Sequence, residues 1–329
     1  MSEQAPTSVV MIRPLRFAPN AETVADNFFQ TRAAVASPLL ADAAYGEVTR
    51  MAEQLVDLDV EVHLFDDPLD HRPDSVFPNN WFSTHPDGRV ALYPMFAPSR
   101  RAERRSDIIT ALRSRYQITS VHDYSVLEDD DMYLEGTGAM VLDHVNRIAY
   151  IARSFRSHDK AVDLVCNHLG YKPVKFATRD LRGAPIYHTN VMMSVGTAVA
   201  VVALDAIADA SERRNVQESL RSTGHTIVAL SFPQVDSFAG NAIEVTSRLG
   251  PVLLMSARGH ESLTTSQRRT ISKHAEIVPI SVPTIELAGG SVRCMVAGIH
   301  LPLRAGRSGV AGTVNLSPLA ALASAASER

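Results

Sequence analysis

The chain has 329 residues, of which 45% are hydrophobic, enough for a large core. Its 32 basic and 36 acidic residues give a formal net charge of −4, so no strong field would attract nucleic acid or an anionic membrane. No apolar run reaches the roughly 18 residues that span a bilayer, and residues 1–9 lack the pattern of a secretion signal. We therefore expect a cytoplasmic protein with no nucleic-acid and no membrane partner, and leave a homo-oligomer open.

The cofactor motifs that are simplest to recognise are missing. Two cysteines, Cys166 and Cys294, supply neither a disulfide framework nor a four-cysteine zinc site. His188 has no second histidine or glutamate at metalloprotease spacing, and the glycines at 136–138 and 289–290 fit neither dinucleotide nor P-loop patterns. We expect no metal and no organic cofactor.

Hydrophobic spacing predicts strands and helices in alternation along the chain. In the first half, strands are predicted at 9–12, 60–65, 138–143 and 147–152, and helices at 21–36, 43–58 and 99–116, the last one capped by Ser99. In the second half, helices are predicted at 159–169, 212–222 and 266–274, and extended segments near 174 and at 190–194, 198–204, 226–230, 242–245, 252–256, 277–280 and 293–300.

A hairpin, a helix and a strand recur at similar spacing without repeated side chains, which indicates a structural repeat. No Gly/Ser-rich or Pro-rich linker interrupts the series. We therefore predict a single α/β domain over residues 1–317, built from similar units around an axis. Residues 318–329 form an Ala/Ser-rich C-terminal tail.

Cys294 follows the turn-forming residues Gly289, Gly290 and Ser291 and precedes an apolar segment. A turn before a strand places a side chain at the rim of a sheet, where a thiol can meet a substrate. Taken alone, the thiol also fits a small core residue. Cys166 lies on the apolar face of a predicted helix and is expected in the core.

Two further residues complete a candidate catalytic set with Cys294. His188 comes where an extended segment emerges from a loop, and Glu135 has glycines directly after it, where the backbone can approach another group closely. Each alone also fits a structural role. A thiol nucleophile needs a base, and the base needs an orienting carboxylate, so the three together indicate nucleophilic catalysis.

Asparagine amides lie near these candidates. Asn79 and Asn80 precede the single tryptophan, and Asn190 follows His188 by two residues. The first two also fit a turn. We regard all three as candidate binding residues.

The order of these motifs resembles the arginine deiminase and amidinotransferase superfamily, in particular the dimethylarginine dimethylaminohydrolases and related citrulline hydrolases. The resemblance spans roughly residues 9–300, and it rests on segments at 73–80, 97–101, 134–137, 154–157, 188–196 and 290–294. It implies a five-bladed α/β propeller, the pentein fold, with pseudo-fivefold repeats around a central channel. It also implies Cys294 as nucleophile, His188 as general acid and base, and Glu135 as the group that orients His188.

The same resemblance implies how an amino-acid substrate is held. Arg156 would bind its α-carboxylate and Asp74 its α-amino group. A second carboxylate-binding arginine of the family falls near Pro94, so that contact is missing or comes from Arg100, Arg101 or another residue.

The amides favour a neutral substrate group. Where guanidine-cleaving relatives use carboxylates, this chain has Asn79, Asn80 and Asn190. A buried guanidinium without a counter-charge is costly, whereas an amide can both donate to and accept from a ureido group. We therefore predict a cysteine hydrolase of citrulline, or of a close ureido amino acid, which converts citrulline to ornithine, ammonia and carbon dioxide. The alternatives are an arginine deiminase or dimethylargininase, an amidinotransferase, and a catalytically silent amino-acid-binding protein.

Overall fold

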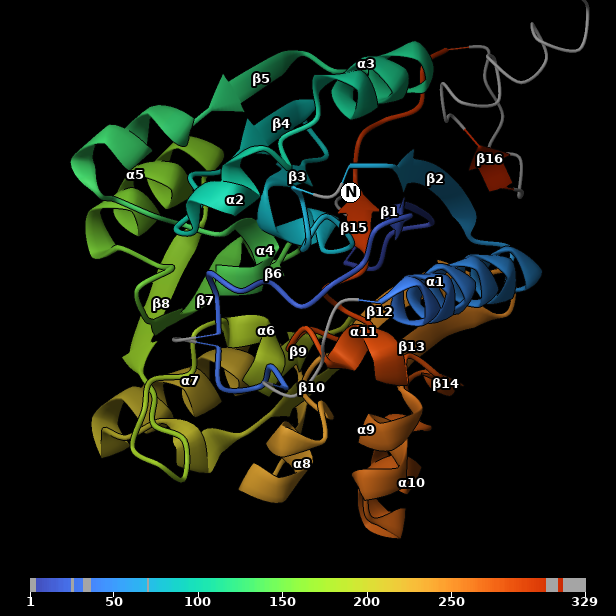
Figure 1. The fold of residues 1–329 in the computed structure, drawn as a ribbon. Coiled ribbons are helices and arrows are strands. Elements are labelled where there is room, and N and C mark those ends of the chain that lie inside the picture. Colours follow the sequence, from blue (N-terminus) through green and yellow to red (C-terminus); the bar gives the residue numbers. More distant parts are fainter. Residues whose placement is uncertain (1–3, 25–26, 32–36, 70, 306–312, 316–329) are drawn as a thin grey trace, which may run out of the picture.

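The computed structural model describes residues 4–24, 27–31, 37–69, 71–305 and 313–315, which form a mixed α/β fold (Figure 1). This part of the chain contains five small sheets, with strand orders β15-β1-β2-β16, β3-β4-β5, β6-β7-β8, β11-β10-β9 and β12-β13-β14. The strands are β1 (Ser8–Pro14), β2 (Glu61–Asp67), β3 (Phe82–Thr84), β4 (Arg89–Leu92), β5 (Ser120–Asp123), β6 (Met140–Asp143), β7 (Ile148–Arg153), β8 (Lys172–Ala177), β9 (Met193–Val195), β10 (Val199–Val202), β11 (Thr226–Ala229), β12 (Ile243–Ser247), β13 (Gly250–Ser256), β14 (Glu276–Ile280), β15 (Ala297–Ile299) and β16 (Thr313–Asn315).

Helices connect the strands. They are α1 (Pro38–Asp57), α2 (Pro98–Arg101), α3 (Ser106–Arg115), α4 (Gly136–Ala139), α5 (Asp159–Leu169), α6 (Thr189–Met192), α7 (Ala210–Ser222), α8 (Phe232–Asp236), α9 (Ala257–Ser262), α10 (Thr265–Ile271) and α11 (Pro283–Glu286). A short 3-10 helix, η1 (Pro78–Asn80), carries two of the candidate amides.

One unit recurs in the sheets, as the sequence predicts. In the unit formed by β6, β7, α5 and β8, the first two strands pair antiparallel and the helix leads to a third strand parallel to the second. The sheets β3-β4-β5, β11-β10-β9 and β12-β13-β14 repeat this pairing. In the remaining sheet, β15 near the C-terminus pairs antiparallel with β1, and β1 pairs parallel with β2 across α1. This sheet thus joins a strand from the first part of the described chain to one from the last part.

Local sequence explains why the helix α5 begins and ends where it does. The side chain of His158 accepts a hydrogen bond from the Lys160 backbone N–H at its start. Gly170 ends it with a φ of 75°, a left-handed conformation that glycine adopts without a steric penalty. Its buried face includes Val162, Val165 and Cys166, and this burial places Cys166 in the core as predicted.

Two helix predictions are wrong. Residues 21–24 and 27–31 of the helix predicted at 21–36 form turns, because side chains of Asn20, Thr23 and Gln30 take over the local hydrogen bonds. The helix predicted at 99–116 is split into α2 and α3, and Ala97, not Ser99, precedes its first turn.

The edge strands of all five sheets meet in the interior. β3, β6, β9, β12 and β15 each lie at the edge of their sheet, and residues of all five line one cavity. Figure 1 shows these strands gathered in the middle of the molecule, with α1, α3, α5, α7 and α10 farther out. In the described part of the chain, no helix is long and apolar enough to cross a membrane.

Candidate active site

Cys294 lies in a turn that follows Gly290 and ends just before β15. Its backbone N–H donates to the carbonyl of Ser291 over 2.9 Å, so the turn extends past the cysteine and the strand starts later than predicted. The thiol is buried, with 2% of the residue exposed. A Cβ at Gly290 would lie 2.7 Å from the ring of Phe77 and 3.2 Å from the Cβ of Cys294, so only glycine allows this close approach.

Two asparagine amides face the sulfur. The Nδ2 of Asn241 lies 3.2 Å from Cys294 Sγ, and the Nδ2 of Asn190 lies 3.4 Å from it. Asn241 also donates to the backbone carbonyl of Asn190 over 3.0 Å, and its Oδ1 accepts from the backbone N–H of Arg293 over 3.1 Å. Donors of this kind stabilise a thiolate and, during catalysis, a developing oxyanion.

Asn241 is the site residue that sequence reasoning missed. It lies between α8 and β12, in a glycine-containing segment typical of a turn, and it is fully buried. Asn241 lies beside Cys294, 53 residues later in the sequence, only because the chain folds so that the start of β12 meets the turn before β15. Its neighbours in the sequence carry no signal of that contact.

His188 and Glu135 form the predicted pair. His188 Nε2 lies 2.8 Å from Glu135 Oε2, and both side chains are buried. Burial lowers the pKa of His188 to about 4, although Glu135 acts in the opposite direction. At neutral pH the imidazole is therefore uncharged and able to accept a proton.

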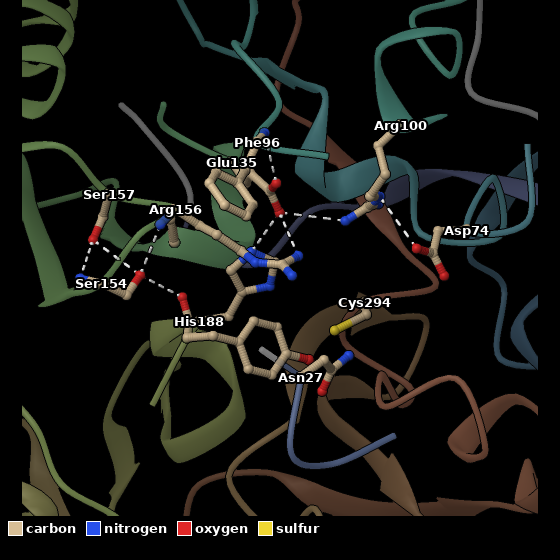
Figure 2. Close-up of polar contacts among 12 residues, drawn as sticks. Asn27, Asp74, Phe96, Arg100, Glu135, Ser154, Arg156, Ser157, His188 and Cys294 are labelled. Atoms are coloured by element: carbon tan, nitrogen blue, oxygen red, sulfur yellow. Dashed lines mark hydrogen bonds and ion pairs between the residues drawn. The ribbon is translucent and has the colours of Figure 1, made fainter. Parts of the chain in front are cut away.

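The Glu135 carboxylate is the centre of a charged network. Figure 2 shows the contacts of Arg100, Arg156 and His188 converging on it, and Oε2 lies 3.3 Å from a guanidinium nitrogen of each arginine. Its Oε1 accepts from the backbone N–H of Phe96 over 3.1 Å. Burial alone would raise the pKa of Glu135, but Arg156, the His188 hydrogen bond and Arg100 hold it well below its ordinary value. The carboxylate stays ionised beside the imidazole.

The predicted binding residues Asp74 and Arg156 lie in the same region (Figure 2). Asp74 Oδ2 accepts from Asn20 over 2.8 Å and lies 3.6 Å from Arg100 Nε, whereas its Oδ1 is buried without a hydrogen-bond partner in the described part of the chain. The guanidinium of Arg156 lies 5.0 Å above the ring of Tyr187. An unsatisfied carboxylate oxygen is suited to an ammonium group.

Of the two candidates for the second carboxylate contact, Arg100 lies at the site and Arg101 does not. Arg101 is paired with Glu128 at 3.3 Å on the outside. Arg100 is buried and makes two contacts of 2.9 and 3.0 Å with Glu103. Burial raises the pKa of Glu103 to about 8 against the opposing effect of Arg100.

The amides Asn79 and Asn80 contact protein groups rather than the sulfur. When the amide of Asn80 is oriented so that both ends are satisfied, its oxygen accepts from Arg100 Nη1 over 2.8 Å and its nitrogen donates to Asn79 Oδ1 over 2.8 Å. In this orientation a Cβ at Gly138 would lie 2.6 Å from the Asn80 amide nitrogen and 2.9 Å from His188 Nδ1, so this glycine lets the two side chains approach. Asn79 is fully buried and does not line the cavity described next.

A small cavity of about 10 Å³ joins the candidate residues. It is lined by Asp74, Asn80, Arg100, Arg156, His188 and Cys294, together with Thr23, Asn27, Phe77, Tyr187, Ala288 and Gly290. This volume holds about one water molecule. Two of the lining residues, Thr23 and Asn27, come from the segment between β1 and α1. In the described part of the chain, no group of three or more His, Cys, Asp or Glu residues could hold a metal ion.

Sequence comparison assigns this arrangement to a known family. A family model described as N,N dimethylarginine dimethylhydrolase, eukaryotic, matches residues 13–301. The chain belongs to this family. The description names a hydrolase of a guanidino compound, and the match confirms the superfamily resemblance seen in the motifs. No curated protein sequence matches the chain.

Solved structures share the fold of this family member at low sequence identity. The N-terminal domain of ArgZ, an arginine dihydrolase from the ornithine-ammonia cycle in Cyanobacteria, has a TM-score of 0.70 and 17% identity over 90% of this chain and 98% of that one. AgrE with L-arginine has a TM-score of 0.71 and 16% identity over 92% and 41%. DDAH from Pseudomonas aeruginosa with citrulline has a TM-score of 0.62 and 16% identity over 91% and 100%.

Proposed function

We propose that the protein hydrolyses citrulline to ornithine, ammonia and carbon dioxide, with Cys294 as nucleophile, His188 as general acid and base, and Glu135 orienting the imidazole. The observation that carries the proposal is the neutral surrounding of the sulfur. Among the described residues, the polar side chains that contact it are the amides of Asn190 and Asn241. The Oδ1 of Asn190 is buried and has no hydrogen-bond partner in the described part of the chain.

These amides fit a ureido group better than a guanidinium. The unsatisfied oxygen of Asn190 can accept from the terminal NH2 of citrulline, and an amide N–H can donate to its carbonyl. The nearby carboxylate of Glu135 is already compensated by Arg100 and Arg156. A guanidinium at the sulfur would lack a counter-charge, which costs several kcal/mol for a buried ion.

The first half of the reaction forms a thioester. His188 takes the proton of Cys294, and Sγ attacks the ureido carbon while the carbonyl oxygen gains negative charge. Asn241 Nδ2 donates to this oxyanion. The tetrahedral intermediate then collapses, the bond from carbon to the ornithine nitrogen breaks, and that nitrogen leaves with the proton from His188. A carbamoyl group remains on the sulfur.

The second half of the reaction regenerates the enzyme. His188 takes a proton from a water molecule, whose oxygen attacks the carbamoyl carbon. The carbon–sulfur bond breaks, the proton on His188 passes to the sulfur, and carbamic acid leaves. Carbamic acid then breaks down to ammonia and carbon dioxide, so no redox partner or cofactor is needed.

Substrate contacts complete the proposal. Arg156 and Arg100 are suited to the α-carboxylate, and the unsatisfied Oδ1 of Asp74 to the α-amino group. Asn79 supports Asn80, whose oxygen is held by Arg100. We also propose that the five sheets close into a single-domain five-bladed propeller over residues 1–317, because an edge strand from each sheet lines one interior cavity.

The test is product analysis with purified protein. Citrulline, arginine and dimethylarginine are supplied separately, and amino acids and ammonia are measured. Ornithine and ammonia from citrulline support the proposal. Citrulline formed from arginine or dimethylarginine, with citrulline itself untouched, would make the protein a guanidino hydrolase, as the family description reads, and would refute the argument from the amides.

A further inference from the structure

A second cavity lies on the other side of Cys294. It measures about 60 Å³ and shares no lining residue with the small cavity that holds the thiol. The edge strands of all five sheets contribute to its wall. Arg293 lines this second cavity, and its neighbour Cys294 lines the first. Two consecutive residues thus separate the two spaces.

Arg293 presents an uncompensated charge to this cavity. Its Nη1 donates to the backbone carbonyl of Val296 over 2.8 Å, and in the described part of the chain no carboxylate forms an ion pair with it. Burial lowers the pKa of Arg293 to about 10, so the guanidinium still carries its charge at neutral pH. The side chain is half-buried, and a guanidinium in such a setting without a carboxylate partner is suited to bind an anion.

Glu244 lines the same cavity and is also incompletely satisfied. Its Oε1 accepts from the backbone N–H and the hydroxyl of Thr197. Its Oε2 is buried and has no hydrogen-bond partner in the described part of the chain, and the residue is 4% exposed. Glu244 and Arg293 do not form an ion pair with each other. The wall therefore holds a guanidinium without a carboxylate partner and a carboxylate with one unsatisfied oxygen, which the Glu244 side chain must turn to bring into the cavity.

The size of the cavity limits the ligand. A space of roughly 10–15 Å³, measured by the positions open to a water-sized probe, holds one water molecule. By that measure, 60 Å³ holds a few waters or one small polyatomic ion. Large phosphoesters and whole amino acids with long side chains do not fit.

We propose that this cavity binds a small trigonal oxyanion that also carries a hydrogen-bond donor, the chemistry shared by bicarbonate and carbamate. Its oxygens would accept from Arg293, and its OH or NH2 would donate to Glu244. The site is distinct from the proposed catalytic centre, and its existence does not depend on the reaction proposed there.

The site is connected to the nucleophile by two hydrogen bonds. The backbone N–H of Arg293 donates to Asn241 Oδ1 over 3.1 Å, and Asn241 Nδ2 donates to Cys294 Sγ over 3.2 Å. An anion bound between Arg293 and Glu244 would shift Arg293, and Arg293 positions Asn241 through its backbone N–H. Occupancy of the cavity is thereby linked to the reactivity of the thiol.

The experiment measures the thermal unfolding midpoint, Tm, of the full chain at pH 8 and constant ionic strength. The probes are sodium bicarbonate, nitrate, which is trigonal but has no donor, and chloride. We expect bicarbonate to raise Tm by about 2 °C at concentrations well above its Kd, with a smaller rise for nitrate and none for chloride. Ammonium added to bicarbonate forms carbamate, and ammonium chloride is the control. If ammonium raises Tm further in bicarbonate but not in chloride, the site binds carbamate better. If Tm does not rise further, the site binds bicarbonate better.

Four variants locate the effect. Arg293→Gln removes the response to both anions, and Glu244→Gln removes the preference for bicarbonate over nitrate. Arg156→Gln alters the arginines around Cys294 instead and keeps the response. If Arg293→Gln does not fold, Ala242→Val narrows the cavity with its charges intact and weakens the response. Three results would overturn the proposal. The rise in Tm with bicarbonate could persist in both Arg293→Gln and Ala242→Val, or it could disappear in Arg156→Gln. Bicarbonate could also change the Tm of the unmodified protein no more than chloride does.

Discussion

Asn241 donates a hydrogen bond from Nδ2 to Cys294 Sγ over 3.2 Å, and its Oδ1 holds the backbone of Arg293 at the same time. One amide therefore fixes both the nucleophile and the residue before it. The contact gives the sulfur a neutral donor, where a carboxylate would repel a thiolate. This relationship leads to the first prediction.

Asn241→Ala should lower kcat by about 10²–10³-fold, because it removes a donor from the sulfur and from the developing oxyanion. Steady-state kinetics with citrulline measures the effect. The matched variant Asn241→Asp keeps the shape but places a carboxylate at the sulfur, so it should shift the pH dependence of Cys294 alkylation to higher pH. Alkylation that follows the same pH curve in all three proteins would show that the contact does not act on the thiolate.

Cys294→Ala should abolish turnover and leave the fold intact, since its side chain is small and lies in a turn. Cys166→Ala is the matched control. Burial raises the pKa of Cys166 to about 12, so this thiol is unreactive, and the variant should keep full activity with a modest loss of stability. Circular dichroism and ammonia release check both variants. Residual turnover in Cys294→Ala would remove the cysteine from the mechanism.

Asn190→Asp should lower citrulline turnover strongly and increase the affinity for arginine, because the new carboxylate faces Sγ without a cation beside it. Asn80→Asp is the comparison, since Arg100 lies 2.8 Å from the Asn80 oxygen and would neutralise a carboxylate there. We expect it to change the ratio of kcat/KM values for citrulline and arginine much less. Equal effects of the two substitutions would contradict the charge argument.

Acid should destabilise the protein between pH 6.5 and about pH 4. Burial lowers the pKa of His63 and of His188 to about 4 and that of His85 to about 3, whereas an unfolded histidine titrates near 6.5. The unfolded state binds more protons in this window, so the free energy of unfolding falls as the pH falls, by about 2 kcal/mol per histidine at pH 5.

Urea unfolding at pH 7.5 and pH 5 measures this loss. His63→Gln should reduce the difference between the two pH values by about 2 kcal/mol, since it removes one titrating group while keeping a partner for the Tyr116 hydroxyl 2.8 Å away. An unchanged difference would mean that His63 does not contribute to acid sensitivity.

The sequence predicts the repeating unit and most of its strands and helices, because each unit has its own apolar periodicity. It also identifies His188 and Glu135, which the structure brings within 2.8 Å of each other. Local periodicity fails where tertiary contacts decide. The segment around Thr23 has helical spacing but forms turns stabilised by side chains. The helix predicted at 99–116 breaks between α2 and α3, where Glu103 makes buried contacts with Arg100.

The amide at the sulfur could not be found from the sequence for a similar reason. Asn241 has no neighbouring motif, and its role depends on how the strand after it packs beside a distant turn. The sequence predicts both Asn80 and Asn190 as substrate contacts but not their different partners. Asn80 is held by Arg100 and lines the cavity that holds the thiol, and Asn190 faces Cys294.

The central claim is tested most directly by trapping the intermediate on Cys294. Citrulline labelled at the ureido carbon is mixed with the enzyme, the reaction is quenched in acid within one turnover, and the peptide that contains Cys294 is analysed by mass spectrometry. The account predicts a labelled carbamoyl group on this cysteine, and none in Cys294→Ala. An amidino group formed from arginine, with no label transferred from citrulline, would contradict it.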